Sequence, residues 1–123
     1  MKYEVDRRAN YLIFKLKEEN LNSIVAPLLK AEFIVFSNEG VRNLIFDVSE
    51  VRFADSSGLS AILTAHRLWK DSGAFVIASP QPTVKKLITL SRLDDILYVV
   101  PTLIEAEDYV MMAEVERELE GEE

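Results

Sequence analysis

The chain has 123 residues, of which 49% are hydrophobic and 28% are charged, and its formal net charge is −7. This length suits one domain with a substantial core, and the composition excludes a disordered or fibrous protein. The acidic balance argues against a nucleic-acid-binding surface, which needs clustered Lys and Arg, and the absence of cysteine excludes disulfides, thiolate metal sites and thiol nucleophiles.

The N-terminal segment predicts a β-hairpin. Residues 5–8 are polar, residues 11–17 (YLIFKLK) have the apolar pattern of a strand, and residues 6–10 can form the turn between them. The first ten residues carry charges throughout and lack the apolar stretch of a signal peptide. No apolar run in the chain approaches the ~20 residues that a membrane span needs. We therefore expect a soluble, cytoplasmic protein.

A helix is expected next. Asn22 and Ser23 are both typical N-cap residues and predict its start, and Gly40 predicts its end. Pro27 falls in the first turn or just beyond it, where the missing N–H costs little. The residues expected on its inward face are Ile24, Val25, Leu28, Leu29, Phe33 and Phe36.

Beyond this helix, strands and helices alternate. In chain order we expect a strand over 41–48, a helix over 57–72 closed by Gly73, a strand over 74–79, a helix over 83–91, a strand over 96–100 and a helix that Thr102 caps. The residues expected to face inward from these helices are Leu59, Ile62, Leu63, His66 and Trp69, then Val84, Leu87, Ile88 and Leu90, and finally Leu103, Ala106, Val110, Ala113 and Val115.

The resulting order, ββαβαβαβα, predicts an α/β fold. Strands that alternate with helices pair in parallel, and the opening hairpin adds an antiparallel edge. We expect a mixed, mostly parallel sheet of about five strands with about four helices, forming one domain over residues 1–115. Residues 114–123 contain six Glu and one Arg. Residues 116–123 are therefore expected to form an acidic tail that frays.

The tetrapeptide Asp55-Ser56-Ser57-Gly58 is the most informative segment, because it lies where a buried strand is followed by an apolar helix. The free N–H groups and the dipole at a helix N-terminus favour added negative charge. A phosphate there would add roughly −1.5 to −2 charges and should be tolerated by the helix terminus. The serines can therefore cap the helix, carry phosphate, or do each in a different state. Position alone favours capping.

Together with the element order, the segment Phe46-Asp47-Val48 … Phe53-Ala54-Asp55-Ser56-Ser57-Gly58-Leu59 resembles the STAS domain of anti-sigma factor antagonists. The resemblance continues in residues 82–87 (PTVKKL) and 91–93 (SRL) and covers residues 2 to 110 or so. Two positions depart from the family pattern. Residues 18–22 (EENLN) replace a Gly-x-Leu-Asp turn, and Arg92 replaces a glycine, which bears on the identity of the partner.

The resemblance implies partner switching in transcription regulation. The unphosphorylated antagonist binds an anti-sigma factor that is also a serine kinase, and thereby frees the sigma factor. The kinase phosphorylates the first serine of the tetrapeptide, here Ser56 (with Ser57 as the less favoured site), and this ends the complex. A 2C-type phosphatase restores the unmodified form. The family thus implies a phosphoprotein that binds other proteins and performs no catalysis.

The expected partner-binding residues lie around this tetrapeptide. They are Asn22, Ser23, Arg52, Asp55, Ser56, Ser57, Gly58, Ser60 and Arg67. For Asp55 we favour a structural role, bonding nearby backbone N–H groups. Gly58 either lets a partner's backbone approach or meets a local conformational need. The single histidine, His66, is expected in a partly buried core position rather than a catalytic one.

No enzyme is predicted. The serines have no matched His-Asp pair, no phosphate-binding glycine loop is present, and one histidine cannot form a metal pair. We expect no cofactor, metal, nucleic acid or membrane insertion. The alternative function is a non-switching STAS adaptor that docks on a membrane transport complex. The particular sigma factor, kinase and phosphatase, any nucleotide binding, and the choice between monomer and weak dimer stay open.

Overall fold

The computed structural model describes residues 1–121. Its elements are β1 (Tyr3–Arg7), β2 (Leu12–Leu16), β3 (Asn20–Leu21), α1 (Val25–Asn38), β4 (Leu44–Asp47), β5 (Phe53–Ala54), α2 (Ser56–Trp69), β6 (Phe75–Ala78), α3 (Pro82–Leu90), a short 3-10 helix η1 (Leu93–Asp95), β7 (Tyr98–Val100) and α4 (Leu103–Gly121).

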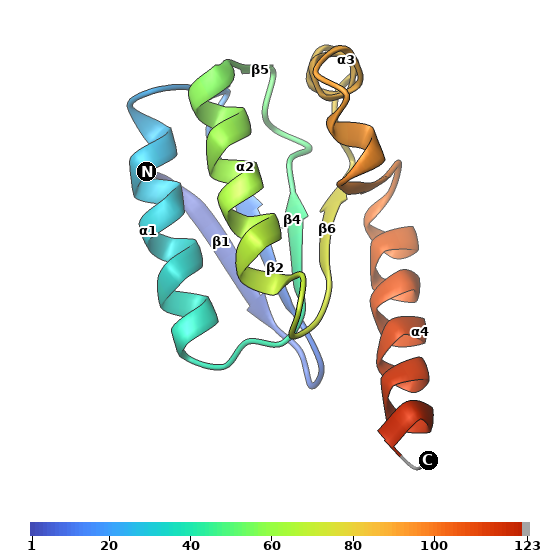
Figure 1. Ribbon diagram of the computed structural model, residues 1–123. Coiled ribbons are helices and arrows are strands. Elements are labelled where there is room, and N and C mark those ends of the chain that lie inside the picture. Colours follow the sequence, from blue (N-terminus) through green and yellow to red (C-terminus); the bar gives the residue numbers. More distant parts are fainter. Residues whose placement is uncertain (122–123) are drawn as a thin grey trace.

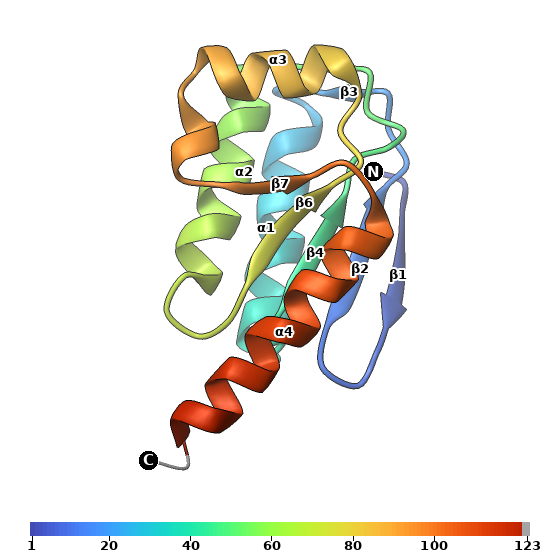
Figure 2. The ribbon, with the colours of Figure 1, turned by 90° about the vertical axis from the view of Figure 1, so that its right-hand side faces the viewer.

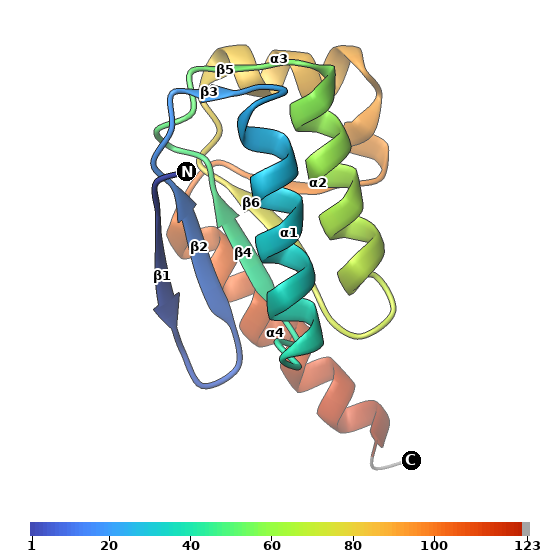
Figure 3. The same ribbon diagram turned by 90° about the vertical axis from the view of Figure 1, so that its left-hand side faces the viewer.

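A five-stranded sheet in the order β1-β2-β4-β6-β7 forms the centre of the molecule (Figure 1). Only β1 is antiparallel to its neighbour, and the other three pairings are parallel. Helices α1 and α2 lie side by side on one face of the sheet (Figure 3), and α4 crosses the other face (Figure 2). The predicted α/β fold with a mixed, mostly parallel sheet is confirmed.

A second, two-stranded sheet was not predicted. Strands β3 and β5 pair in parallel, with Asn20 opposite Phe53 and Leu21 opposite Ala54. Each strand has two residues, which is too short for the apolar alternation that identifies a strand in a sequence. The pairing brings the end of the opening segment beside the start of α2, at the end of the sheet where the parallel strands terminate.

Aromatic side chains fill the core between the sheet and the α1–α2 layer. Phe33 of α1 packs edge-on against Phe46 at 5.3 Å and against Trp69 at 6.0 Å between ring centroids. Trp69 is fully buried, and its indole N–H donates to the Val41 carbonyl at 2.8 Å. Such contacts join both helices to the sheet, so the geometry at their N-terminal ends rests on a rigid core.

Four residues expected to face inward are exposed instead: Ile24, Leu28, Leu90 and Val115. The cause is helical phase, because successive side chains rotate by about 100° around the helix axis. In α1 the buried face is centred on Val25, Leu29 and Phe33. Leu28 lies about 100° around the helix axis from Leu29 and therefore outside this face. Ile24 precedes the helix, and Leu90 and Val115 lie on the outer sides of their helices.

The last helix is longer than expected. Thr102 caps it as predicted, because its hydroxyl accepts a hydrogen bond from the Glu105 N–H at 3.1 Å. Helix α4 then continues unbroken to Gly121, so residues 116–121 are helical, and the fraying expected of them stays a prediction. Residues 122–123 lie outside the described residues. Arg117 holds this part of the helix to the sheet through the network described next.

A buried polar network centred on Asn43 joins α4 to the sheet. The Asn43 amide nitrogen donates to the Asn10 carbonyl and to Glu114, both at 2.7 Å. Its amide oxygen accepts from the Ala74 N–H at 2.9 Å and from Arg117 at 2.7 Å. Arg117 also pairs with Glu114. One fully buried side chain thus connects the β1–β2 turn, the start of β6 and the middle of α4.

The network shifts the pKa of Glu114 downward. Burial alone would raise this pKa, but hydrogen bonds from Asn43 and Arg117 and the charges of Arg117 and Arg42 outweigh burial. The unfolded chain has the higher pKa, near the ordinary 4.5. The carboxylate therefore stabilises the fold fully above this value, and the contribution is lost as the pH falls through the folded-state pKa.

We expect Glu114→Gln to make stability less dependent on pH in acid. The urea midpoint of the native chain should fall more steeply than that of Glu114→Gln as the pH is lowered from about 6 to 3. The exposed Glu118, on the same helix, provides the control variant Glu118→Gln. Coinciding pH profiles of the two variants would contradict this assignment.

Candidate functional site

The exposed hydroxyl of Ser56 lies at the first residue of α2. Within residues 1–121 it makes no hydrogen bond to another protein group, and the neighbouring Ser57 is half-buried. The tetrapeptide therefore occupies the predicted junction between strand and helix, and Ser56 presents its side chain to solvent.

Asp55, and neither serine, caps α2. Its backbone is extended, and its carboxylate accepts hydrogen bonds from the N–H groups of Ser57 at 2.9 Å and Gly58 at 3.1 Å. This confirms the structural role predicted for Asp55, whereas the expectation that Ser56 or Ser57 caps the helix is wrong. Since the carboxylate caps the helix through the Ser57 and Gly58 amides, the Ser56 hydroxyl is not needed as a cap.

Gly58 is buried and faces the protein's own chain. A methyl group added there would lie 2.5 Å from the Leu21 carbonyl oxygen and 2.7 Å from Leu21 Cγ, closer than atoms can pack. The glycine therefore lets α2 begin directly against β3. The need at Gly58 is thus one of packing within the chain and not of a special backbone conformation, and the approach of a partner's backbone stays a prediction.

A groove of about 340 Å³ runs beside Ser56 between the first turns of α1 and α2. Its lining residues are Ser23, Ala26, Pro27, Lys30, Ser56, Ser57 and Ser60. Lys30 is the one charged residue of this set, and its ammonium donates to the Ser60 hydroxyl at 3.0 Å across the groove. Ser56 and Ser60 are four residues apart and so lie on the same side of α2.

Exposed apolar side chains surround this end of the molecule. Ile24 is 76% exposed and Leu28 49% exposed at the start of α1, and Phe53 is 56% exposed in β5. We call Ile24, Leu28 and Phe53 the apolar rim. Lys30 was not predicted as a site residue, and Ile24 and Leu28 were expected in the core. Counting the helical phase of α1 from its buried phenylalanines would have placed Leu28 and Lys30 outside the core.

The structure brings most of the predicted partner-binding residues together. The Asp55 N–H donates to the Leu21 carbonyl at 3.2 Å, which places residues 20–23 beside residues 52–58. Asn22 is half-buried, and its amide oxygen accepts from the N–H groups of Ile24 and Val25, so it orders the entry to α1. Ser23 and Ser60 are exposed in the groove.

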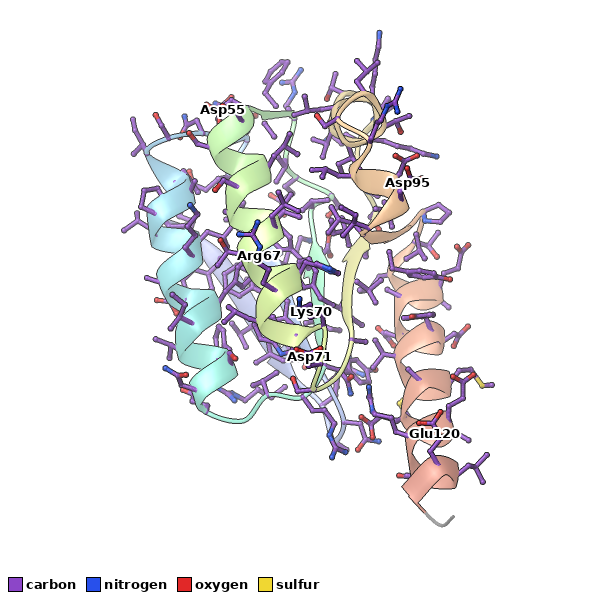
Figure 4. The ribbon with its side chains drawn as sticks, in the orientation of Figure 1. Asp55, Arg67, Lys70, Asp71, Asp95 and Glu120 are labelled. Atoms are coloured by element: carbon purple, nitrogen blue, oxygen red, sulfur yellow. The ribbon has the colours of Figure 1, made fainter. Side chains whose placement is uncertain are left out.

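Two arginines extend away from the groove. The Arg52 guanidinium lies 5.9 Å from the centre of the Phe53 ring and 3.9 Å from the Glu19 carboxylate. Arg67 is exposed but lies eleven residues after Ser56 on α2, about 16 Å along the helix at 1.5 Å per residue. Figure 4 shows Asp55 at the start of α2 and Arg67 well along the same helix. Arg67 is therefore outside the cluster formed by the other residues.

Among the described residues, the groove beside Ser56 contains neither the histidine nor a group of metal-binding side chains. His66 is half-buried on α2, as expected, and lines a separate hollow beside Lys70 and Tyr109. Within residues 1–121, His, Asp and Glu side chains form no group that could hold a metal ion. None of the helices in that range combines the length and apolarity required to cross a bilayer. The arrangement can present a hydroxyl, one ammonium and an apolar rim to another macromolecule.

Comparisons with known proteins agree with this geometry. A family model described as the STAS domain matches residues 2–106. A protein of Thermotoga maritima that is named as an anti-sigma factor antagonist is 29% identical over 101 residues, which cover 80% of this chain and 89% of the relative.

Solved structures extend the comparison. A crystal structure of an anti-sigma factor antagonist from Thermotoga maritima superimposes with a TM-score of 0.78 at 27% identity, covering 89% of this chain and 94% of that one. SpoIIAA, a Bacillus cell fate determinant solved in its phosphorylated form, shares the fold. Its TM-score is 0.68 at 21% identity, and the match covers 89% of this chain and 99% of that one. From the family match over residues 2–106 and the shared architecture, we conclude that the chain belongs to the STAS domain family.

Proposed function

We propose that the protein is an anti-sigma factor antagonist that switches partners through phosphorylation of Ser56. The unmodified form binds an anti-sigma factor with serine kinase activity in the cytoplasm, and phosphorylation releases it. A 2C-type phosphatase resets the switch. The observation that carries the proposal is the exposed, unengaged hydroxyl at the start of α2, beside an amide cap already provided by Asp55.

The groove and the apolar rim supply the contact surface in this proposal. Ile24, Leu28 and Phe53 offer apolar area that a partner can bury, and Ser56 lines the groove between α1 and α2 at the same end of the molecule. A kinase docked on this end of the molecule would thus have the Ser56 hydroxyl within reach. Arg67 and Gly58 are not part of this surface, because the first is distant and the second is buried.

A phosphate on Ser56 would disrupt this contact by charge and size. It adds roughly −1.5 to −2 charges to a surface on which a partner packs closely. We expected the helix terminus to accommodate this charge, but its amides at Ser57 and Gly58 are already bonded to Asp55. The phosphate therefore stays in the groove, repelled by the Asp55 carboxylate and attracted by Lys30.

Mapping of the modified residue tests the proposal. The protein is incubated with anti-sigma factor kinases and ATP, and phosphorylation is located by mass spectrometry. We expect modification of Ser56 in the native chain and in Ser57→Ala, and none in Ser56→Ala. Modification at another position would overturn the assignment of Ser56. A bound kinase that modifies no residue would favour the non-switching adaptor.

Lys30 provides a separate prediction, because it is positioned to pair with phosphate across the groove. Phosphoserine is installed at position 56 during translation, and its second pKa is followed by phosphorus NMR. We expect this pKa to be about 0.5 higher in Lys30→Met, because a nearby positive charge favours the dianion. Lys70→Met removes an exposed lysine near the other end of α2 and is the control. Equal values in the two variants would exclude the pairing.

A further inference from the structure

The outer side of α4 carries an apolar stripe. Ile104, Met111, Met112, Val115 and Leu119 are all exposed, with Ile104 at 72% and Met112 and Leu119 at 59%. We call these five residues the outer stripe. At about 100° per residue they fall on one side of the helix, roughly opposite Ala106 and Val110, which are fully buried against the sheet. Helix α4 is thus apolar on two opposite sides, and only one of them is covered within residues 1–121.

Acidic side chains surround the outer stripe. Asp108 lies within it by helical phase, Glu118 borders one side, and Glu105 and Glu116 border the other, and all four are exposed. Helix α4 has seven acidic residues and one Arg. This helix therefore contains most of the excess negative charge of the chain, arranged around an apolar centre.

Most of this surface lies beyond the residues that the family model matches. The family match ends at residue 106, whereas α4 continues to Gly121. In Figure 2 the last turns of α4 run past the end of the sheet, and Figure 4 places Glu120 in this projecting part. A contiguous apolar patch on a projecting helix is unusual in a protein that acts alone, and such patches mark interaction surfaces.

We propose that the outer stripe binds a basic amphipathic helix of another protein. The apolar side of that helix would lie along Met111, Val115 and Leu119, and its Lys and Arg side chains would pair with Asp108 and Glu118. Charge complementarity selects this occupant. A second copy of α4 would bring carboxylates against carboxylates, and a membrane-surface helix carries Lys and Arg where α4 carries Glu.

The outer stripe is independent of the Ser56 groove. Helix α4 and the α1–α2 layer lie on opposite faces of the sheet (Figure 1), so one protein could occupy each surface at the same time. The inference therefore does not rest on phosphorylation of Ser56 or on the proposed switching function.

Fluorescence anisotropy with a synthetic basic amphipathic peptide of Leu and Lys tests the apolar part of the surface. Val115→Ala with Leu119→Ala removes apolar area while keeping good helix formers, and we expect binding about tenfold weaker. The control is Ile34→Ala with Val35→Ala, which removes exposed apolar area from α1. We expect the control to bind as the native chain does, and circular dichroism checks that every variant is folded.

The acidic residues around the outer stripe are tested with a second double variant and a matched control. Asp108→Asn with Glu118→Gln should weaken binding about threefold at low salt, and the difference should vanish at high salt. Asp94→Asn with Asp95→Asn removes two exposed carboxylates from η1 and should leave the affinity unchanged.

Several results would overturn the proposal. The peptide could fail to bind, bind every variant equally, or bind no better than a peptide of Leu and Glu. Sedimentation could instead show a dimer of the native chain that Val115→Ala with Leu119→Ala abolishes, which would make a second copy the occupant. Binding to anionic phosphatidylserine vesicles that depends on the outer stripe would make a lipid surface the occupant.

Discussion

Ser56→Asp is expected to weaken binding to an anti-sigma factor about tenfold or more, whereas Ser56→Ala should bind as the native chain does. The aspartate places a fixed negative charge at the groove beside Asp55, where a closely packed partner must desolvate it. A tenfold loss corresponds to about 1.4 kcal/mol, a modest cost for a misplaced charge at an interface. Isothermal titration calorimetry with purified partner measures both affinities.

The control for this pair is Ser72→Asp, which adds the same charge to an exposed serine just beyond the other end of α2. Its affinity should match that of the native chain, and so should the thermal stability of Ser56→Ala, because Asp55 caps the helix without the serine. If Ser56→Asp and Ser56→Ala bind with equal affinity, charge at this position does not control the complex. Membership of the STAS family would be unaffected by that result.

Asn43→Ala is expected to lower the free energy of unfolding by about 3 kcal/mol, the largest effect on stability that we predict. The truncation leaves the Asn10 carbonyl and the Ala74 N–H without their side-chain partner. It also removes a donor from the almost fully buried Glu114 carboxylate. Buried polar groups that lose their partners keep the desolvation cost without the compensating bond. Urea unfolding followed by circular dichroism measures the change.

Asn38→Ala is the matched control, because Asn38 is exposed at the end of α1. We expect it to change stability by less than about 0.5 kcal/mol. A loss below about 1 kcal/mol in Asn43→Ala would show that the network around Asn43 contributes little to holding α4 on the sheet. Hydrogen exchange of the α4 amides should report the same difference locally, because the network attaches the C-terminal half of α4 to the sheet.

Much of the architecture could be predicted from local patterns. Strands β4 and β6 are buried on both faces and appear in the sequence as continuous apolar runs, which is typical of central parallel strands. The tetrapeptide was placed correctly at the start of α2, because a strand-like run precedes it and a helical spacing follows it. The cap at Thr102 and the alternation of strands and helices were confirmed for the same reason.

The candidate site was predicted only in part. The roles of Asp55 and Ser56 depend on which side chain reaches the free amides, and both residue types are common caps. Gly58 is buried because Leu21 of β3 packs against it, and a strand of two residues is too short to be recognised in a sequence. Ile24 and Leu28 were assigned to the core because an apolar residue near the start of a helix fits a stripe of almost any phase.

The sequence by itself determined the order of elements, the family resemblance and the position of the exposed serine at a helix start, because these depend on neighbouring residues and on spacing within a few turns. Only the tertiary structure decided that Asp55 caps, that Leu21 passes against Gly58, and that Lys30 reaches Ser60 across the groove. These contacts join distant segments, as do Asn43 and Glu114, which lie 71 positions apart. Their geometry is set by how the layers pack, which no local pattern encodes.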